Sequence, residues 1–289
     1  MGTAGTSDRK IPTRRISFEE SLRELPRYFA EDGDLVSGHV IAGLSAVFPD
    51  GEEYFVRSVR RFRDQVEDPE LKRQVAGFMG QESVHGREHR ALNDRLGELG
   101  YPTKLVERIT DKGLRLREKI MSPKSNLAAT AALEHFTATL AELVLTNERV
   151  RNMIGHEEVR NLFIWHALEE SEHKAVAFDV YKAVGGSERT RVWTMRILRY
   201  GFLIGMTFQV VAAMLFDPAT YKPGRLRKSL RKVQGSPIVD RALWTRLKDY
   251  ERPDFHPDDH DTTELIAVWR EKLFGAEGSL NDKLAGSAA

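Results

Sequence analysis

Residues 165–181 read WHALEESEHKAVAFDVY, and three of their side chains decide the expected fold. His166, Glu170 and His173 are separated by four and then three positions. Successive residues of an α-helix turn by about 100°, so these three side chains lie on one helical face. The segment is therefore predicted to be a helix that directs one carboxylate and two imidazoles toward a common point.

Residues 81–93, QESVHGREHRALN, show a similar arrangement earlier in the chain. Glu82 and His85 form a Glu-x-x-His pair, and His89 follows one helical turn later on the same face. One such pair is a weak signal. Two pairs are also unsurprising by composition, so the inference depends on the ordered set of six residues on four predicted helices.

Two further glutamates complete an ordered set along the chain. Glu52 precedes Glu82 by 30 positions, and Glu134 precedes Glu170 by 36 positions. The two halves therefore look like two copies of one helical hairpin, joined by a long crossover. Carboxylates and Glu-x-x-His pairs in this order are typical of four-helix bundles that hold two metal ions in their core.

Helical periodicity without strand-type alternation extends through residues 50–216. The apolar segment 34–48 ends at Pro49-Asp50-Gly51, which predicts a turn before Glu52. The expected fold class is all-α: a ferritin-like four-helix bundle with extra helices and an irregular C-terminal extension. The expected helices cover residues 52–66, 68–99, 103–120, 122–147, 155–184, 187–216 and 261–273.

Composition divides the chain into three parts. Residues 1–33 are polar and charged, and they are predicted to form an N-terminal arm. Residues 34–216 are predicted to form the metal-binding bundle, with an apolar last helix. Residues 217–289 are predicted to be a C-terminal extension that contains a basic segment, a short helix and a flexible tail.

The composition also excludes several kinds of site and partner. Lys and Arg number 44 and Asp and Glu 43, and this net charge of +1 gives no general attraction for nucleic acid. The chain has no cysteine, which excludes disulfides, thiolate zinc sites and Cys-ligated iron–sulfur clusters. A metal site must therefore use histidine and carboxylate. No apolar signal-peptide core is present near the first residue, so a cytoplasmic location is expected.

The expected cofactor is a pair of iron ions, with iron and manganese as the alternative. Bridging carboxylates offset the repulsion between two cations, and one imidazole per ion favours iron or manganese over magnesium. The expected ligands are Glu52, Glu82, His85, Glu134, His166, Glu170 and His173. His89 is expected either to be an additional metal ligand or to hydrogen-bond one of the ligands. Glu169 has the same two possible roles, and a solvated position is a third interpretation for it.

Several segments resemble the family of predicted metal-dependent hydrolases. They are GEEYF (51–55), QESVHGREHRALN (81–93), ALEHFTATLAE (132–142), WHALEESEHKAVAFDVY (165–181) and FHPDD (255–259). The resemblance covers about residues 35–275 and implies a ferritin-like fold with a dimetal site. The fourth-helix motif is also similar to that of the di-iron arylamine N-oxygenases. That second resemblance implies His166 as a third imidazole ligand, with hydrogen bonding to a ligand as its alternative role.

Three functions are consistent with these residues. The main expectation is an O₂-activating di-iron oxygenase or oxidase that acts on a hydrophobic or amine substrate, with O₂ and an external electron donor as partners. The alternative is a hydrolase that uses a metal-activated water. The third is a non-catalytic iron-binding protein.

Residues 200–216, YGFLIGMTFQVVAAMLF, are seventeen positions without a charge. One interpretation is a helix buried against the bundle or in a homodimer interface. Another is contact with a membrane surface, because the basic stretch from Lys222 to Lys232 suits anionic headgroups. A third is a single membrane span, for which seventeen residues are at the short limit. The second interpretation would place the protein peripherally at the inner face of the membrane.

Overall fold

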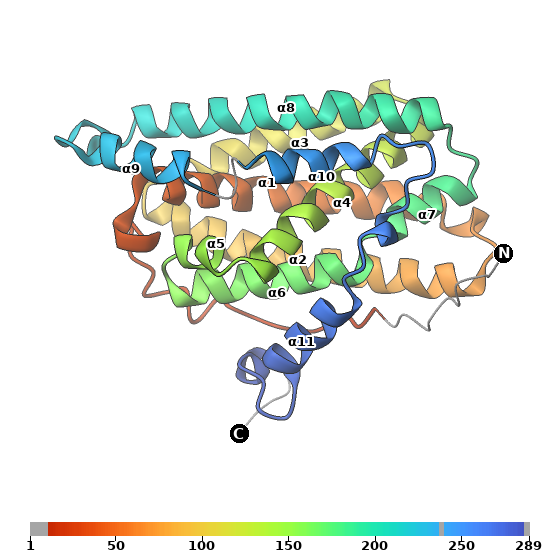
Figure 1. Cartoon of the computed structure of the whole chain (residues 1–289), viewed down its shortest axis with the longest axis horizontal. Coiled ribbons are helices and arrows are strands. Elements are labelled where there is room, and N and C mark those ends of the chain that lie inside the picture. Colours follow the sequence, from red (N-terminus) through yellow and green to blue (C-terminus); the bar gives the residue numbers. More distant parts are fainter. Residues whose placement is uncertain (1–10, 237–239, 286–289) are drawn as a thin grey trace.

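The protein is an all-α helical bundle, as the sequence predicts (Figure 1). The computed structural model describes residues 11–236 and 240–285, and these residues contain no β-strand. Four of the helices, α1, α2, α4 and α6, pack against one another around a common core. The helices are α1 (Leu35–Arg60), α2 (Pro69–Glu98), α3 (Thr103–Ile120), α4 (Pro123–Thr146), α5 (Glu148–Met153), α6 (Glu157–His173), α7 (Val176–Ala183), α8 (Glu188–Leu215), α9 (Arg225–Gln234), α10 (Arg241–Asp249) and α11 (Thr263–Phe274).

Local sequence signals fix most helix ends where they were expected. Asp68 caps α2, and Ser122 caps α4, each with a side-chain oxygen that accepts a backbone N–H of the first turn. A proline follows each cap as the first helical residue, where its missing N–H costs nothing. Helix α8 begins after Ser187 and lies along the outside of the bundle over α1 and α4 (Figure 1).

The turn predicted at Pro49 is wrong, because α1 continues through this residue. A proline inside a helix has no N–H to bond the carbonyl four residues earlier. That carbonyl belongs to Ser45, and the Asn93 side chain of α2 donates to it over 3.1 Å. The neighbouring helix thus satisfies the group that Pro49 leaves free, and Glu52 lies on the same long helix as Ser45.

The single helix predicted over 155–184 is divided into α6 and α7. The break lies at Lys174 and Ala175, directly after the His173 of the expected site. The buried Lys174 ammonium donates to the Thr262 hydroxyl over 3.0 Å and to the His260 carbonyl, both of the C-terminal extension. Contacts from a distant segment therefore decide this break, and the local sequence gives no signal of it.

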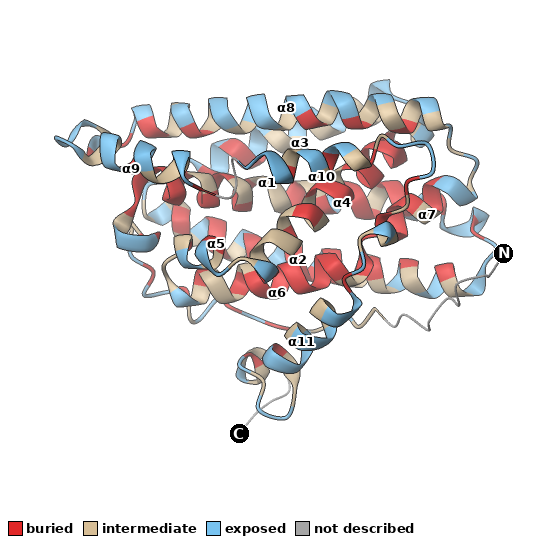
Figure 2. Ribbon diagram, in the orientation of Figure 1, coloured by how far each residue is buried: buried red, intermediate tan, exposed pale blue. Residues whose placement is uncertain are grey.

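The helices bury their inner sides (Figure 2), and the apolar core of the described residues has two large parts along the bundle and a small third part where the ends of α1 and α8 meet. One large part contains Tyr54, Phe78 and Tyr181, and the other contains Leu92 and Trp165. In α2 the first part covers residues 71–78 and the second includes 92 and 96, with the predicted ligands between them. The expected metal site therefore lies in a polar layer between two apolar layers.

The first and last segments of the described chain pack on the bundle. Phe18 of the N-terminal arm is fully buried and lies against Trp165, with ring centroids 5.8 Å apart. The tail predicted to be flexible is ordered through residue 285: Leu280 is fully buried, and Leu284 pairs with Ile16 of the arm. Apolar anchors among small polar residues hold this tail, while residues 286–289 lie outside the described part. The extension also forms α9 and α10, which the sequence analysis did not predict.

We expect Phe18→Ala to reduce the free energy of unfolding by about 3–5 kcal/mol, because it leaves a cavity beside Trp165. Urea unfolding followed by circular dichroism measures the change. Glu19→Ala, an exposed neighbour, is the control and should change stability by less than about 0.5 kcal/mol. Equal stability of both variants would show that the arm does not belong to the cooperative core.

Candidate metal centre

The seven predicted ligands meet in the polar layer of the bundle. Helix α1 provides Glu52, α2 provides Glu82 and His85, α4 provides Glu134, and α6 provides the other three. Each of the seven residues is at most 4% exposed. The structure therefore brings together, from four helices, side chains that are up to 121 positions apart in the sequence. The three from α6 are His166, Glu170 and His173.

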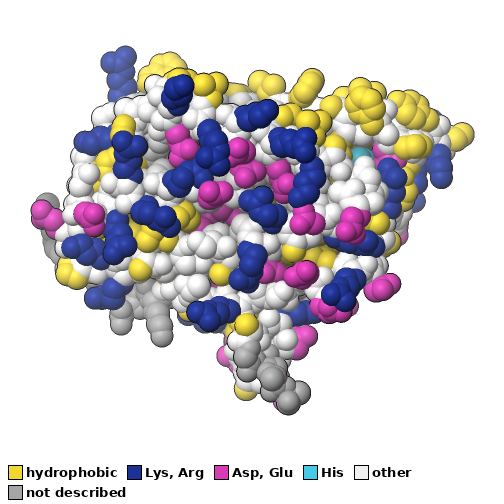
Figure 3. All heavy atoms as spheres, turned by 180° about the vertical axis from the view of Figure 1, so that it is seen from behind, with side chains coloured by type: hydrophobic (Ala, Val, Ile, Leu, Met, Phe, Trp, Pro, Cys, Tyr) yellow, Lys and Arg dark blue, Asp and Glu magenta, His cyan; other side chains and the backbone are white. Residues whose placement is uncertain are grey.

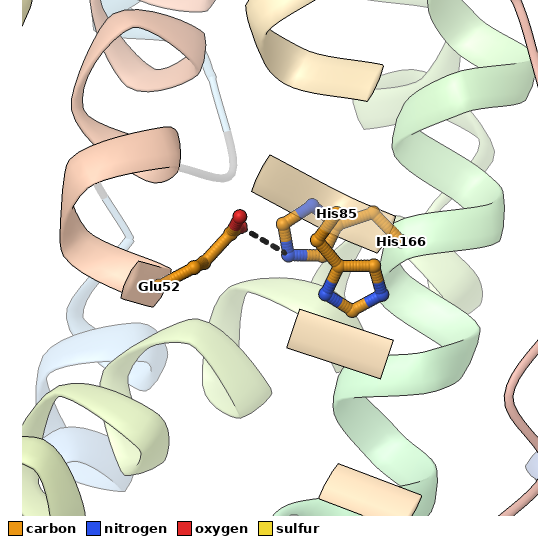
Figure 4. A group of neighbouring side chains, drawn as sticks. All are labelled: Glu52, His85 and His166. Carbon is orange, nitrogen blue, oxygen red and sulfur yellow. Dashed lines mark ion pairs between the residues drawn. The ribbon is translucent and has the colours of Figure 1, made fainter. Parts of the chain in front are cut away.

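Two groups of three side chains have the compactness of metal sites. Glu52, His85 and His166 form the first group, and Figure 4 shows them converging from three helices. The second group consists of Glu82, Glu170 and His173. Within each group, one potential ligand atom per residue lies within 4.8 Å of the others. Glu134 adjoins the second group, since its Oε2 lies 3.5 Å from Nε2 of His173.

The cluster contains buried polar atoms that no protein group satisfies. Both carboxylate oxygens of Glu52, Glu82 and Glu134 lack a hydrogen bond to any described residue. The same holds for Nδ1 of His85 and Nε2 of His173. The His173 nitrogen faces carboxylate oxygens at 3.0 and 3.5 Å without the geometry of a hydrogen bond. Such orphaned groups are costly when buried, and metal ions would satisfy them together.

Electrostatics also favour cations in this cluster. Burial and the neighbouring Glu82 raise the pKa of Glu52 well above its usual value. Burial and the neighbouring Glu170 and Glu82 raise the pKa of Glu134 in the same way. Burial alone would lower the pKa of His173, but the nearby carboxylates, Glu170 foremost, raise it well above its usual value. Four buried carboxylates thus attract either protons or metal ions.

A hydrogen bond outside the cluster fixes the tautomer of His173. The Gln81 amide nitrogen donates to the Pro12 carbonyl and to Glu172, so its oxygen faces His173. That oxygen accepts a hydrogen bond of 2.8 Å from Nδ1–H of His173. In the neutral imidazole that a metal ligand requires, the lone pair of Nε2 therefore points at the carboxylates.

A longer chain of hydrogen bonds fixes the tautomer of His166. The Asn93 amide nitrogen donates to Glu107 and to the Ser45 carbonyl, and its oxygen accepts from the Ser45 hydroxyl over 2.7 Å. Ser45 must then accept from Nδ1–H of His89 at 3.0 Å, and His89 Nε2 accepts from His166 Nδ1–H at 2.7 Å. Nε2 of His166 is left as an acceptor.

The orientation of His166 puts two acceptors face to face. Its Nε2 lies 3.0 Å from Oε1 of Glu170 and 3.8 Å from Oε1 of Glu52, the pair joined by a dashed line in Figure 4. A nitrogen lone pair and a carboxylate oxygen at 3.0 Å repel unless a cation lies between them. His89 contacts His166 and not the carboxylates, so the structure places it as a hydrogen-bonding support.

The third histidine, His85, is oriented by Glu169. Nε2–H of His85 donates to Oε2 of Glu169 over 3.0 Å, while Nδ1 faces Glu82 and Glu170 at 3.7 Å. Arg14 of the N-terminal arm donates to Oε1 of the same glutamate over 2.8 Å. A solvated position for Glu169 is therefore wrong: its side chain is fully buried between a histidine and an arginine.

Sequence reasoning missed Arg14 and Gln81. Arg14 binds both oxygens of Glu172 at 2.8 Å, and Glu172 in turn accepts from Gln81. One arginine thus supports two of the three histidines, each through intervening side chains. In the sequence, Arg14 is a basic residue in a polar arm, and such residues are usually solvated, so nothing marks it as a support of the histidines.

An apolar cavity of about 660 Å³ leads from the surface to the cluster. It lies between α1, α3, α4 and α8, and it reaches Glu52 and Glu170. Its walls are mostly apolar side chains, such as Phe55, Phe136 and Phe202. A second cavity of about 140 Å³ approaches His166 and Glu170 from the opposite side of Phe48.

Comparison with models of protein families identifies the family of this chain. The model of the predicted metal-dependent hydrolases matches residues 12–261. The chain belongs to this family. A comparison with curated proteins and one with solved structures found no significant match.

Membership in the metal-dependent hydrolase family overturns the main functional expectation. An O₂-activating di-iron oxygenase or oxidase was expected, and the family match instead supports the alternative, a metal-dependent hydrolase. The similarity to arylamine N-oxygenases is limited to the spacing of one helix, and spacing alone does not determine a reaction. Hydrolysis needs neither O₂ nor an electron donor, so these two expected partners have no role in it.

We expect Glu52→Gln to separate the destabilising effect of a buried carboxylate from its contribution to metal binding. Removing one buried carboxylate should stabilise the metal-free protein by roughly 1 kcal/mol and reduce Mn²⁺ affinity at least about tenfold. Thermal unfolding with and without Mn²⁺, together with calorimetric titration, measures both effects. Glu53→Gln changes the exposed neighbour and should change neither. A destabilised variant with unchanged affinity would argue against Glu52 as a ligand.

We expect Arg14→Leu to reduce metal affinity about 10–100-fold, because Glu169 loses its cation and Glu172 keeps only Arg270. Calorimetric titration with Mn²⁺ measures the change. Arg15→Leu, at an exposed position next to it, is the matched control and should bind as the wild type does. Wild-type affinity in Arg14→Leu would show that the arm covers the cluster without orienting it.

Proposed function

We propose that this protein is a dinuclear metal-dependent hydrolase of esters, either carboxylic or phosphate esters, that carry a long apolar chain. Family membership supports the reaction class. The observation that carries the proposal is a buried set of seven carboxylate and imidazole ligands at the inner end of an apolar cavity. The same seven residues, Glu52 to His173, are proposed to hold two divalent ions.

The proposed metals are Fe²⁺ or Mn²⁺. Imidazole and carboxylate donors suit both ions, and no cysteine is available to favour softer metals. When bound, such ions polarise a carbonyl or phosphoryl oxygen and lower the pKa of water. We do not assign the two positions to different metals, because both groups contain the same types of ligand.

The protein's own residues supply orientation and the exclusion of water. In the neutral form that binds a metal, each of the three histidines is held as a single tautomer with its free nitrogen directed inward. Thr137, which lines both cavities, donates to Glu170 and holds that carboxylate in place. The apolar walls admit a hydrocarbon chain and exclude bulk solvent, which strengthens the electrostatic interactions at the reacting bond.

The proposal predicts metal-dependent hydrolysis that does not need O₂. Purified protein should hydrolyse p-nitrophenyl carboxylic or phosphate esters after loading with Mn²⁺ or Fe²⁺, lose this activity on chelation and regain it on reloading. Rates should be equal in air and under anaerobic conditions. Absence of metal-dependent hydrolysis in both ester series would refute the proposal.

A matched pair of glycines tests the cavity within the same assay. Gly205 lines the cavity and Gly201, one turn earlier on α8, does not, and a side chain has free space at either. Gly205→Phe should reduce kcat/KM for long acyl esters about tenfold and spare short ones, because the ring occupies the path of the chain. Gly201→Phe should leave the chain-length preference unchanged. Equal profiles for both variants would show that substrate enters elsewhere.

A further inference from the structure

Helix α8 is exposed along one side of its whole length (Figure 2), and large apolar side chains form a stripe on that side. The spacing of the stripe is that of one helical face, and Phe208 at its centre is 75% exposed. Large apolar side chains that recur in this way on a soluble surface mark an interaction site. The stripe consists of Trp193, Ile197, Tyr200, Ile204, Phe208, Val211 and Leu215, and it ends at Phe216, which is 88% exposed.

Helix α3 adds a second apolar row across the cavity from α8. Leu105, Ile109, Leu116 and Ile120 are all more than half exposed. Leu105 and Ile109 also line the large cavity, as do Phe208 and Phe216 of the α8 side. Figure 3 shows hydrophobic side chains gathered along the edge formed by α8 and over its end beside α9. The mouth of the cavity therefore opens onto this α3–α8 face.

Cations predominate around the α3–α8 face. In α3, α8 and α9, which are fully described, the most exposed charged side chains are Lys or Arg. The partly exposed acidic side chains of α3 and α8 are paired with cations of this chain: Asp111 with Arg115, Glu118 with Arg57 and Glu188 with Lys182. Three of the exposed cations lie on α9: Arg227, Lys228 and Arg231, none of which forms an ion pair with a described residue. The whole chain carries a net charge of only +1, so this concentration of cations is local.

We propose that the α3–α8 face, together with α9, binds the surface of a bilayer that contains anionic lipids. Exposed apolar rows bordered by lysine and arginine, with Trp193, Tyr200 and Tyr221 among them, have the chemistry of a membrane-surface site. A second copy of this chain is less well matched. A two-fold contact through this face brings its cations near those of the partner, and the acidic side chains of α3 and α8 already pair with cations of their own chain.

Helix α8 is long and apolar enough to cross a membrane, the one such helix among the described residues, and 17% of its apolar window is buried. Its inner side nevertheless holds it on the bundle. Arg191 is fully buried and donates to carbonyls of the C-terminal extension, and Arg199 pairs with Glu251 at 2.9 Å. A spanning orientation would break these contacts, so α8 lies in the plane of the membrane surface.

The membrane face also defines where the substrate comes from, a step that rests on the proposed function. Because the cavity opens on this face, a lipid chain passes from the bilayer toward Glu52 and Glu170 without crossing water. The substrate class is then an ester-linked membrane amphiphile. Binding to the membrane itself needs no catalysis and stands independently of hydrolysis.

Cosedimentation with vesicles tests the membrane face on the full-length chain. The probes are vesicles of phosphatidylcholine alone and of phosphatidylcholine mixed with phosphatidylglycerol, at low and high salt. We expect binding to the mixed vesicles that weakens as salt rises. Ile204→Glu/Phe208→Glu should reduce the partition coefficient at least about tenfold. Arg227→Gln/Arg231→Gln should reduce it about fivefold for each cation removed.

The controls distinguish membrane binding through this face from dimer formation through the same face, and membrane binding from hydrolysis. Val268→Glu, on α11 away from the face, should bind vesicles as the wild type does. No binding to either vesicle, or binding unaffected by Ile204→Glu/Phe208→Glu, would overturn the proposal. So would a stable dimer in light scattering that the same double variant dissociates and that does not bind vesicles. Vesicle binding by a chain inactive on soluble esters would refute the hydrolase proposal alone.

Discussion

The structure depends on the burial of four carboxylates, those of Glu52, Glu82, Glu134 and Glu170, at one level of a helical bundle. Ionised carboxylates that share a dry site repel one another, and leaving water is costly for each of them. Three imidazoles in the same layer offset part of this cost, and six carboxylate oxygens remain without a hydrogen bond among the described residues. Metal ions remove the conflict, so stability and metal binding are physically linked here.

A second layer of hydrogen bonds decides how the histidines face this charge. Pro49 frees the Ser45 carbonyl, Asn93 binds that carbonyl, and the orientation of Asn93 fixes His89 and then His166. Proline usually ends helices, but Pro49 contributes here to the orientation of the His166 side chain. On the other side, an arginine of the N-terminal arm supports the cluster, which makes the arm part of the functional unit.

The molecule is asymmetric in a way that suits a lipid-like substrate. One side of the bundle is covered by the arm, α11 and the C-terminal tail, while the side formed by α3 and α8 is apolar and bordered by cations. The large cavity connects this open side with the carboxylate layer. The family of predicted metal-dependent hydrolases supports hydrolysis as the proposed reaction, and the apolar lining of the cavity supports a substrate with an apolar chain.

The sequence by itself determined the all-α fold class and the candidate metal ligands. Helical spacing places side chains i, i+3 and i+4 on one face of a helix, whatever surrounds that helix. The sequence also determined capped ends such as that of α2, since caps are local. Tertiary structure alone decided the continuation of α1 through Pro49, the break after His173, and the burial of Arg14 and Glu169, because partners distant in sequence satisfy those groups. It also decided that the apolar side of α8 faces outward, since periodicity shows that an apolar face exists but not what covers it.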